Sequence, residues 1–406
     1  MTSPVDTSVK FFHSGMVGAP TLAGVAGRLI ALLDACLVDG FGALNLTGIT
    51  VSGGIATAAF SGTFPALPDM VVLLGGATGS YTALNGEQKV TAVGTGTFQF
   101  ATGLPNGTAT GTITAKMAPA GWAKPFSGTN LAVYRSNDVT SNRFFLRVND
   151  TNALDARVVG YETMTAISTG TNLFPTSAQR SGGGYWPKVQ QTGAETVSWM
   201  LFANGKRFWF ANAVFEQTSF SGGQFDAMRI GGFGDFKSLK ATVDAYNGFL
   251  LSGPGSGSLD GSIGMTYSGA EDAKLSITRL HTNVVGARIG THWTPGCTMS
   301  GYASGNYTGS ALGPVNGVSA KLILAKPVLY TGVEVYGVRG EWPEIRHTPQ
   351  WIPPAIPNLL KYDIVPGVDE LAGRKLMVIP TNHTPGPSVD TESRRAAFID
   401  ITGPWG

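Results

Sequence analysis

The sequence predicts a mainly β protein of several domains, made of β-sandwich or barrel units with one N-terminal amphipathic helix and a proline-rich C-terminal arm. Its 406 residues include 56 glycines and 23 prolines, and only 13% are charged. Hydrophobic residues reach 43%, which is too many for a solvated disordered chain. A chain of this length is also too long for one ordinary core. Many short strands joined by glycine-rich turns fit this composition best.

We expect four segments along the chain. An arm and a helix that pack on the main body come first, and a small inserted β-sandwich or barrel of immunoglobulin-like size follows. A main β body with a candidate division at 253–264 comes next, and a proline-rich arm with the final strands ends the chain. The boundaries are 1–45, 46–116, 117–342 and 343–406.

The first segment carries the only long helical pattern. A strand is expected at 9–12, and Pro20 and Thr21 are placed to open a helix. Apolar residues then recur at spacings of three and four, and Gly40 is a plausible stop. These apolar positions are Leu22, Val25, Ala26, Leu29, Leu32, Leu33, Cys36 and Leu37. A single apolar stripe predicts a helix that packs on a sheet or on another subunit.

The second segment has the sequence features of a small all-β module. Turn residues such as Asn85-Gly86 separate its short β-prone runs. The runs are 49–51, 56–60, 70–74, 88–93, 97–100 and 110–114. About 70 residues with six strands fit a small sandwich or barrel. Because the two ends of such folds lie close together, we expect the module to be an insertion.

The main body is organised around the stretch 121–148. Trp122, Pro125 and Phe126 form an aromatic and proline corner, and β-prone runs follow at 131–135 and 143–149. Their alternation predicts a hairpin with one buried face. The runs 197–203 and 207–213 flank Asn204-Gly205, which is the strongest hairpin signal in the chain.

The last segment is rich in proline, which excludes a regular sheet interior there. We expect an extended arm anchored by Trp351, then strands at 374–379 and 396–401 before Trp405. Such an arm can lace subunits together. Deleting 343–406 is therefore expected to weaken assembly while the main body stays folded.

No residue pattern in the sequence forms a catalytic constellation. The histidines stand singly, so we predict no metal site and no cofactor; they are His13, His281, His292, His347 and His383. Several carboxylates lie in or near one glycine-rich span, namely Asp226, Asp235, Asp244, Glu271 and Asp272. A glycosidase needs two carboxylates facing each other across a sugar, but capping of turns is the commoner role of such residues. We expect a protein that is not an enzyme, and polysaccharide degradation stays an alternative.

Aromatic residues supply the candidate contact sites. Tyr185 and Trp186 follow a glycine-rich bend and have the rings to stack on a sugar, although core or interface anchoring is the commoner fate. The candidate interface or ligand-contact residues are Trp122, Phe126, Tyr185, Trp186, Trp351 and Trp405.

Charge and hydropathy exclude two classes of partner. The formal net charge is +2 and the longest basic run is Arg394-Arg395, so we predict no nucleic-acid partner. No stretch approaches the ~20 apolar residues of a membrane span, and the N-terminus lacks a signal-peptide pattern, so we expect synthesis in the cytoplasm. Cys36 fits a buried hydrophobic position, and its pairing with Cys297 stays open.

Several stretches resemble a family of structural proteins of tailed bacteriophages and prophages. They are FFHSGM (11–16), PAGWAKPFSGTNLAVYRS (119–136), RFFLRV (143–148), GGGYWPK (182–188), LAGRKLMVIP (371–380) and DITGPW (400–405). The resemblance implies a virion component of the tail tip or baseplate, with other tail proteins and copies of itself as partners. It supplies no catalytic residues. Two alternatives stay open: a host receptor- or carbohydrate-binding tail protein that uses 46–116 or the Tyr185-Trp186 loop, and a capsid decoration or head-associated protein.

Overall fold

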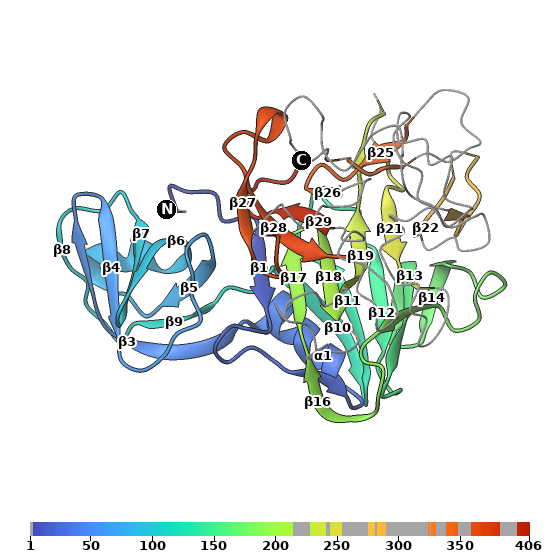
Figure 1. Cartoon of the computed structure of the whole chain (residues 1–406), viewed down its shortest axis with the longest axis horizontal. Coiled ribbons are helices and arrows are strands. Elements are labelled where there is room, and N and C mark those ends of the chain that lie inside the picture. Colours follow the sequence, from blue (N-terminus) through green and yellow to red (C-terminus); the bar gives the residue numbers. More distant parts are fainter. Residues whose placement is uncertain are drawn as a thin grey trace.

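The structure is a computed structural model, and it is mainly β, as predicted. It consists of a body of stacked sheets with a separate barrel beside it (Figure 1). The residues that it describes are 3–213, 228–240, 244–253, 275–280, 282–289, 324, 326–329, 338–347, 359–381 and 396–406.

The predicted helix is present but begins later than expected. Helix α1 spans Arg28–Leu33 and continues as a π-helix, η1, over Asp34–Asp39. The expected start at Pro20 is wrong, because Leu22–Gly24 form strand β2 and pair with β16, Gly193–Val197. Apolar residues at 22 and 23 satisfy a strand as well as a helix, so spacing alone could not separate the two. Gly40 follows the last helical residue with a φ of 75°, which is the stop that its position predicts.

The small module is a closed six-stranded barrel. Its hydrogen-bonded order is β3-β4-β7-β6-β5-β9, and β9 pairs with β3 and closes the ring. Strand β8 adds to the outside of β3. The strands are β3 Phe41–Ser52, β4 Ile55–Phe60, β5 Val71–Gly75, β6 Gly86–Gly94, β7 Thr97–Ala101, β8 Gly107–Thr108 and β9 Thr114–Met117. The last strand is shifted from the expected 110–114, since Thr110 makes only an isolated bridge to Thr78.

The chain enters and leaves the barrel at one place. Phe41, at the start of β3, pairs with Met117, at the end of β9. The barrel therefore lies as an insertion between η1 and β10, and both connections reach the body side by side (Figure 1).

Two antiparallel sheets form the body. The first has the order β1-β17-β18-β19-β21-β22-β23, and the second has the order β10-β11-β12-β13-β14, with β15 on β13. The strands of the first are Lys10–His13, Trp199–Ala203, Arg207–Ala213, Met228–Asp235, Gly248–Leu251, Leu275–Ile277 and Arg288–Ile289. Those of the second are Trp122–Gly128, Leu131–Ser136, Phe145–Asn149, Asp155–Ala166, Thr169–Phe174 and Gly184–Pro187.

Aromatic rings from both sheets meet between them. Trp122 of β10 stands edge-on to Phe208 of β18 at 5.3 Å, and Phe174 of β14 stacks on Phe233 of β19 at 6.1 Å. Such pairs add specific geometry to a large buried area. The body is thus a sandwich with an aromatic interior.

The first predicted hairpin exists, but the expectation of a single buried face is wrong. Strands β11 and β12 pair as predicted. Ala132 and Tyr134 face the main core, while Val133 belongs with Phe145 to a second cluster on the opposite face. Both faces of this sheet carry buried apolar side chains, so the alternation along 131–135 separates two cores and not a core from solvent.

The second hairpin, β17–β18, confirms the Asn204-Gly205 signal. Asn204 Oδ1 accepts the backbone N–H groups of Lys206 and Arg207, each at 2.9 Å. The asparagine therefore closes this turn through its side chain.

The described part of the C-terminal segment packs on the chain's own body. A four-stranded sheet runs β26-β29-β28-β27, and a three-stranded one runs β20-β25-β24. Their bounds are β20 Lys237–Ser238, β24 Val328–Leu329, β25 Gly340–Glu341, β26 Ile345–His347, β27 Ile364–Pro366, β28 Lys375–Pro380 and β29 Ala396–Asp400. The last two strands confirm the predicted pair, and Ile399, Ile401 and Trp405 join the main core. Trp351, the proline-rich stretch around it and nearly all of 253–264 lie outside the described residues.

A buried ion pair fastens the helix to the second sheet. The Lys188 ammonium pairs with the Asp150 carboxylate, and both side chains are 0% exposed. Asp150 also accepts the N–H groups of Leu29 (2.8 Å) and Ile30 (3.1 Å) in the first turn of α1. Burial raises the pKa of Asp150, although Lys188 and these N–H groups act to lower it. One carboxylate thus caps the helix and neutralises a buried lysine.

We predict that Lys188→Met lowers the free energy of unfolding by about 3–5 kcal/mol, because it leaves a buried carboxylate without its cation. Urea unfolding followed by circular dichroism measures this. The matched control is Lys124→Met, which removes a half-exposed pair with Asp34 and should cost about 1 kcal/mol or less. Equal losses in the two variants would contradict this assignment.

Candidate functional site

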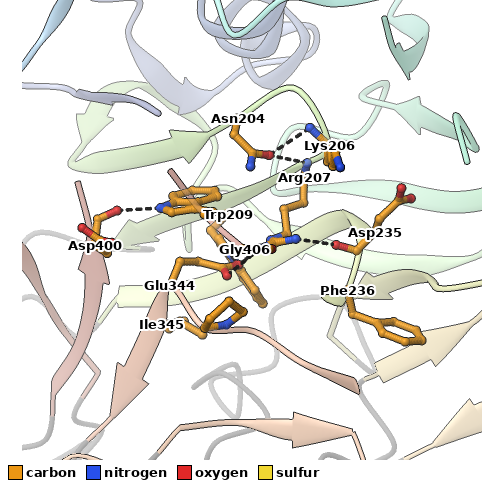
Figure 2. Close-up of polar contacts among 12 residues, drawn as sticks. Asn204, Lys206, Arg207, Trp209, Asp235, Phe236, Glu344, Ile345, Asp400 and Gly406 are labelled. Atoms are coloured by element: carbon orange, nitrogen blue, oxygen red, sulfur yellow. Dashed lines mark hydrogen bonds and ion pairs between the residues drawn. The ribbon is translucent and has the colours of Figure 1, made fainter. Parts of the chain in front are cut away.

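A buried polar centre surrounds Arg207 (Figure 2). Arg207 Nε donates to Glu344 Oε1 at 2.7 Å, and Nη2 donates to Glu344 Oε2 at 2.9 Å. Nη1 donates to the carbonyl of Asp235 at 3.1 Å, and Nη2 also donates to the carbonyl of Gly406 at 2.7 Å. The indole N–H of Trp209 donates to Glu344 Oε1 at 2.9 Å.

The fold gathers this centre from four segments of the chain. Arg207 opens β18 directly after the Asn204 turn, Asp235 ends β19, and Glu344 immediately precedes β26. The chain end closes the centre, because the guanidinium lies 5.9 Å from the Trp405 ring. Charged residues within aromatic strands are rare unless they are paired. The pairing partner, however, lies 137 residues away in sequence, so the sequence could not identify it.

The charged groups of this centre bind each other and hold separate segments of the chain together. We call the centre the Arg207 clamp. The side chains of Arg207 and Glu344 are 2% and 0% exposed, and the Glu344 oxygens are occupied by Arg207 and Trp209. A carboxylate held in this way is not free to act as a base or nucleophile. The two parallel hydrogen bonds instead fix the position of the C-terminal segment around Glu344 relative to β18.

We predict that Glu344→Ala costs about 3–5 kcal/mol in the free energy of unfolding, because the buried guanidinium loses its counter-charge. Thermal and urea unfolding measure the loss. Glu370→Ala is the matched control: Glu370 also pairs with an arginine, Arg346, but is 72% exposed, so its loss should be about 1 kcal/mol or less. A chain lacking 396–406 should likewise be less stable. This prediction replaces the expectation from the sequence that the C-terminal segment can be deleted while the main body stays folded. Full stability of either altered chain would refute the clamp.

The predicted carboxylates do not form an open pair in the described residues. Asp235 is buried, and its Oδ2 accepts the N–H of Asn142 at 2.9 Å. Asp244 is bound to Arg339 by two contacts of 2.8 and 3.1 Å. Burial acts to raise the pKa of Asp244, but the hydrogen bonds and charge of Arg339 bring it below its usual value. Both residues therefore hold turns, which is the commoner role; Asp226, Glu271 and Asp272 lie outside the described residues.

Asp235 nevertheless has a shifted titration. Burial raises its pKa to about 6, against the lowering effects of hydrogen bonds from Asn142 and Ser141 and of the Arg207 charge. A carboxyl whose pKa rises on folding binds its proton more tightly in the folded state. Protonation therefore stabilises the fold as the pH falls from about 6 towards 4, and this contribution is lost as the pH rises.

We predict a matching pH dependence of stability. Wild-type protein should lose about 3 kcal/mol from this group between pH 4 and pH 7, because the pKa differs by about two units at about 1.4 kcal/mol each. Asp235→Asn keeps an acceptor for Asn142 and removes the titration. Urea unfolding at several pH values should thus show a flatter curve for the variant. Parallel curves would contradict the assignment.

The aromatic candidates fall into different environments. The structure buries Trp122, Trp186 and Trp405 in the core, and each indole N–H reaches a backbone carbonyl: Asn204 (2.9 Å), Leu251 (2.8 Å) and Asp400 (2.8 Å). Phe126 is half-buried against the outer cluster of the second sheet. These positions make the rings packing anchors of their own chain.

Tyr185, like Phe126, keeps some exposure. One face of its ring is covered by Arg157, whose guanidinium carbon lies 3.9 Å from the ring centroid. Arg157 also bonds the carbonyls of Ser181 and Gly183. The glycine-rich bend is thus fixed onto the arginine, and a sugar stacking on Tyr185 has only the opposite face.

The histidines and cysteines show no shared site in the described part of the chain. His13 stacks on Tyr362 at 4.4 Å, and burial lowers its pKa to about 4. Cys36 is a buried free thiol whose pKa is raised by burial. Within the same residues, no group of three His, Cys, Asp or Glu side chains is arranged to hold a metal ion. His281, His292, His383 and Cys297 lie outside the described residues.

Comparison with known proteins adds no relative. Neither the family models nor the curated proteins contain a match to this chain. Within the described residues, none of the helices combines the length and apolar character that crossing a membrane requires.

Proposed function

We propose that this protein is a structural component of a tailed-phage virion, located in the tail tip or baseplate, where it assembles as a homo-oligomer. In this proposal it acts by binding and not by catalysis. The resemblance of six stretches to phage structural proteins supports the virion role. The supporting observation from the structure is that its most deeply buried charges fasten distant segments together.

Three such pairs show the pattern. Lys188–Asp150, Arg207–Glu344 and Arg339–Asp244 join residues that are 38, 137 and 95 positions apart. Each pair has both side chains buried. Buried pairs of this kind contribute little net stability over apolar packing but disfavour alternative arrangements. A fixed shape suits a part that must fit neighbouring subunits.

We predict that the chain is present in intact particles of the phage or prophage that encodes it. Gly406 lies in the Arg207 clamp, so we place the epitope in the exposed turn around Val139 on the body, away from the barrel. Electron microscopy with a gold-labelled antibody should mark the tail end, with untagged particles as the control. Label on the head would favour the capsid-decoration alternative. If mass spectrometry of purified particles does not detect the chain, the virion role is refuted.

A second candidate is recognition of a host glycan or surface protein. The barrel favours it, because it stands apart from the body as a separate lobe (Figure 1). Alterations of the barrel surface or of the Tyr185 bend would then abolish adsorption of particles whose morphology is normal. Normal adsorption by such particles would exclude this candidate.

A further inference from the structure

The barrel has an unusual distribution of charge. Residues 41–117 are all described, and their only charged side chains are Asp69, Glu87, Lys89 and Lys116. A soluble surface normally carries charges of both signs on about a quarter or more of its positions. The barrel therefore has far fewer charges than its exposed area predicts.

All of these charges contact the rest of the chain. Asp69 pairs with Lys375 at 2.7 Å, and Glu87 pairs with Lys10 at 2.9 Å. Lys89 Nζ donates to the carbonyl of Thr402 at 2.8 Å, and Lys116 Nζ donates to the carbonyl of Asp39 at 2.5 Å. These contacts orient the barrel on the body and leave its remaining surface without a charged group.

We call that remaining surface, on β3, β4, β7, β8, the end of β6 and the β6–β7 turn, the neutral face. Strands β4 and β8 lie at the end of the molecule away from the body (Figure 1). Threonine, serine, glycine and alanine dominate its exposed positions, together with Ile55 (38% exposed) and Val93 (43% exposed). The barrel's aromatic rings are buried or half-buried, so none of them is a fully exposed sugar platform.

We propose that the neutral face is a contact between copies of this chain. Identical surfaces that carry an excess of one sign of charge repel when they face each other, and a surface without charge removes that repulsion. The centres of protein interfaces are likewise depleted of charged residues. A nucleic acid, an anionic glycan or a charged membrane surface finds no counter-charge here. Because the six-stranded ring is closed and the edge strand β8 is only two residues long, copies meet through side chains and not by adding strands.

The inference rests on the proposed homo-oligomer, and light scattering after size-exclusion chromatography tests it on the full chain. The wild type should be oligomeric, and its dissociation constant should change by less than about twofold between low and high salt, because no charge is screened. Two double variants place like charges on the face: Thr50→Lys with Thr108→Lys, and Thr57→Lys with Gln99→Lys. Residues 50 and 108 pair across β3 and β8, and 57 and 99 pair across β4 and β7.

At least one lysine variant should raise the dissociation constant by about tenfold or more. Mixing it with the chain that carries glutamate at the same two positions should restore association, which an unfolded variant cannot do. Val139→Lys with Val284→Lys, at body residues that are 83% and 53% exposed, is the charge-matched control and should associate normally. A monomeric wild type, or oligomers unaffected by both lysine variants, would overturn the inference. Its failure is distinguishable from that of the virion role, which depends on whether particles contain the chain.

Discussion

The bidentate contact between Arg207 and Glu344 is the constraint on which the arrangement of the body depends. It places a full positive charge among aromatic strands and neutralises it with a residue that arrives much later in the chain. Without Glu344, the guanidinium would be buried without a counter-charge, which is far more costly than an exposed one. The C-terminal segment must therefore pack over β18, and the carbonyl of Gly406 is a further acceptor for the Arg207 guanidinium. The final residues are part of the core for this reason.

The same principle operates at two further positions. Asp150 neutralises Lys188 while it caps α1, and Asp244 neutralises Arg339 beside the turn that precedes β21. Each of these two pairs reinforces a backbone contact between the same segments: Lys188 N–H donates to the carbonyl of Leu154, and Leu239 N–H donates to that of Arg339. A sandwich of short strands could otherwise slip in register, because flat, weakly patterned strands specify their pairing poorly. Because separating the partners leaves a buried charge uncompensated, we infer that these pairs hold the sandwich in one arrangement.

The barrel uses charge differently. Its ion pairs and lysine–carbonyl contacts lie on the side that meets the body, with Lys10, Lys375, Thr402 and Asp39 as partners. The residues that orient the barrel on the body are therefore different from those that form its outer surface. Since the chain enters and leaves through the neighbouring residues Phe41 and Met117, the module could change its outer surface with little effect on the body.

Local patterns in the sequence determined much of the strand content. The Asn204 turn, the β11–β12 and β28–β29 pairs and most barrel strands follow from alternation and turn residues, which act over a few positions. They could not determine the start of α1, because residues 22–24 suit a strand or a helix equally and only pairing with β16 decides. Nor could they show that the hairpin at 131–149 separates two cores, that the barrel closes, or that Arg207 meets Glu344. Those outcomes depend on contacts between residues far apart in the chain, whose energies appear only once the tertiary structure brings them together.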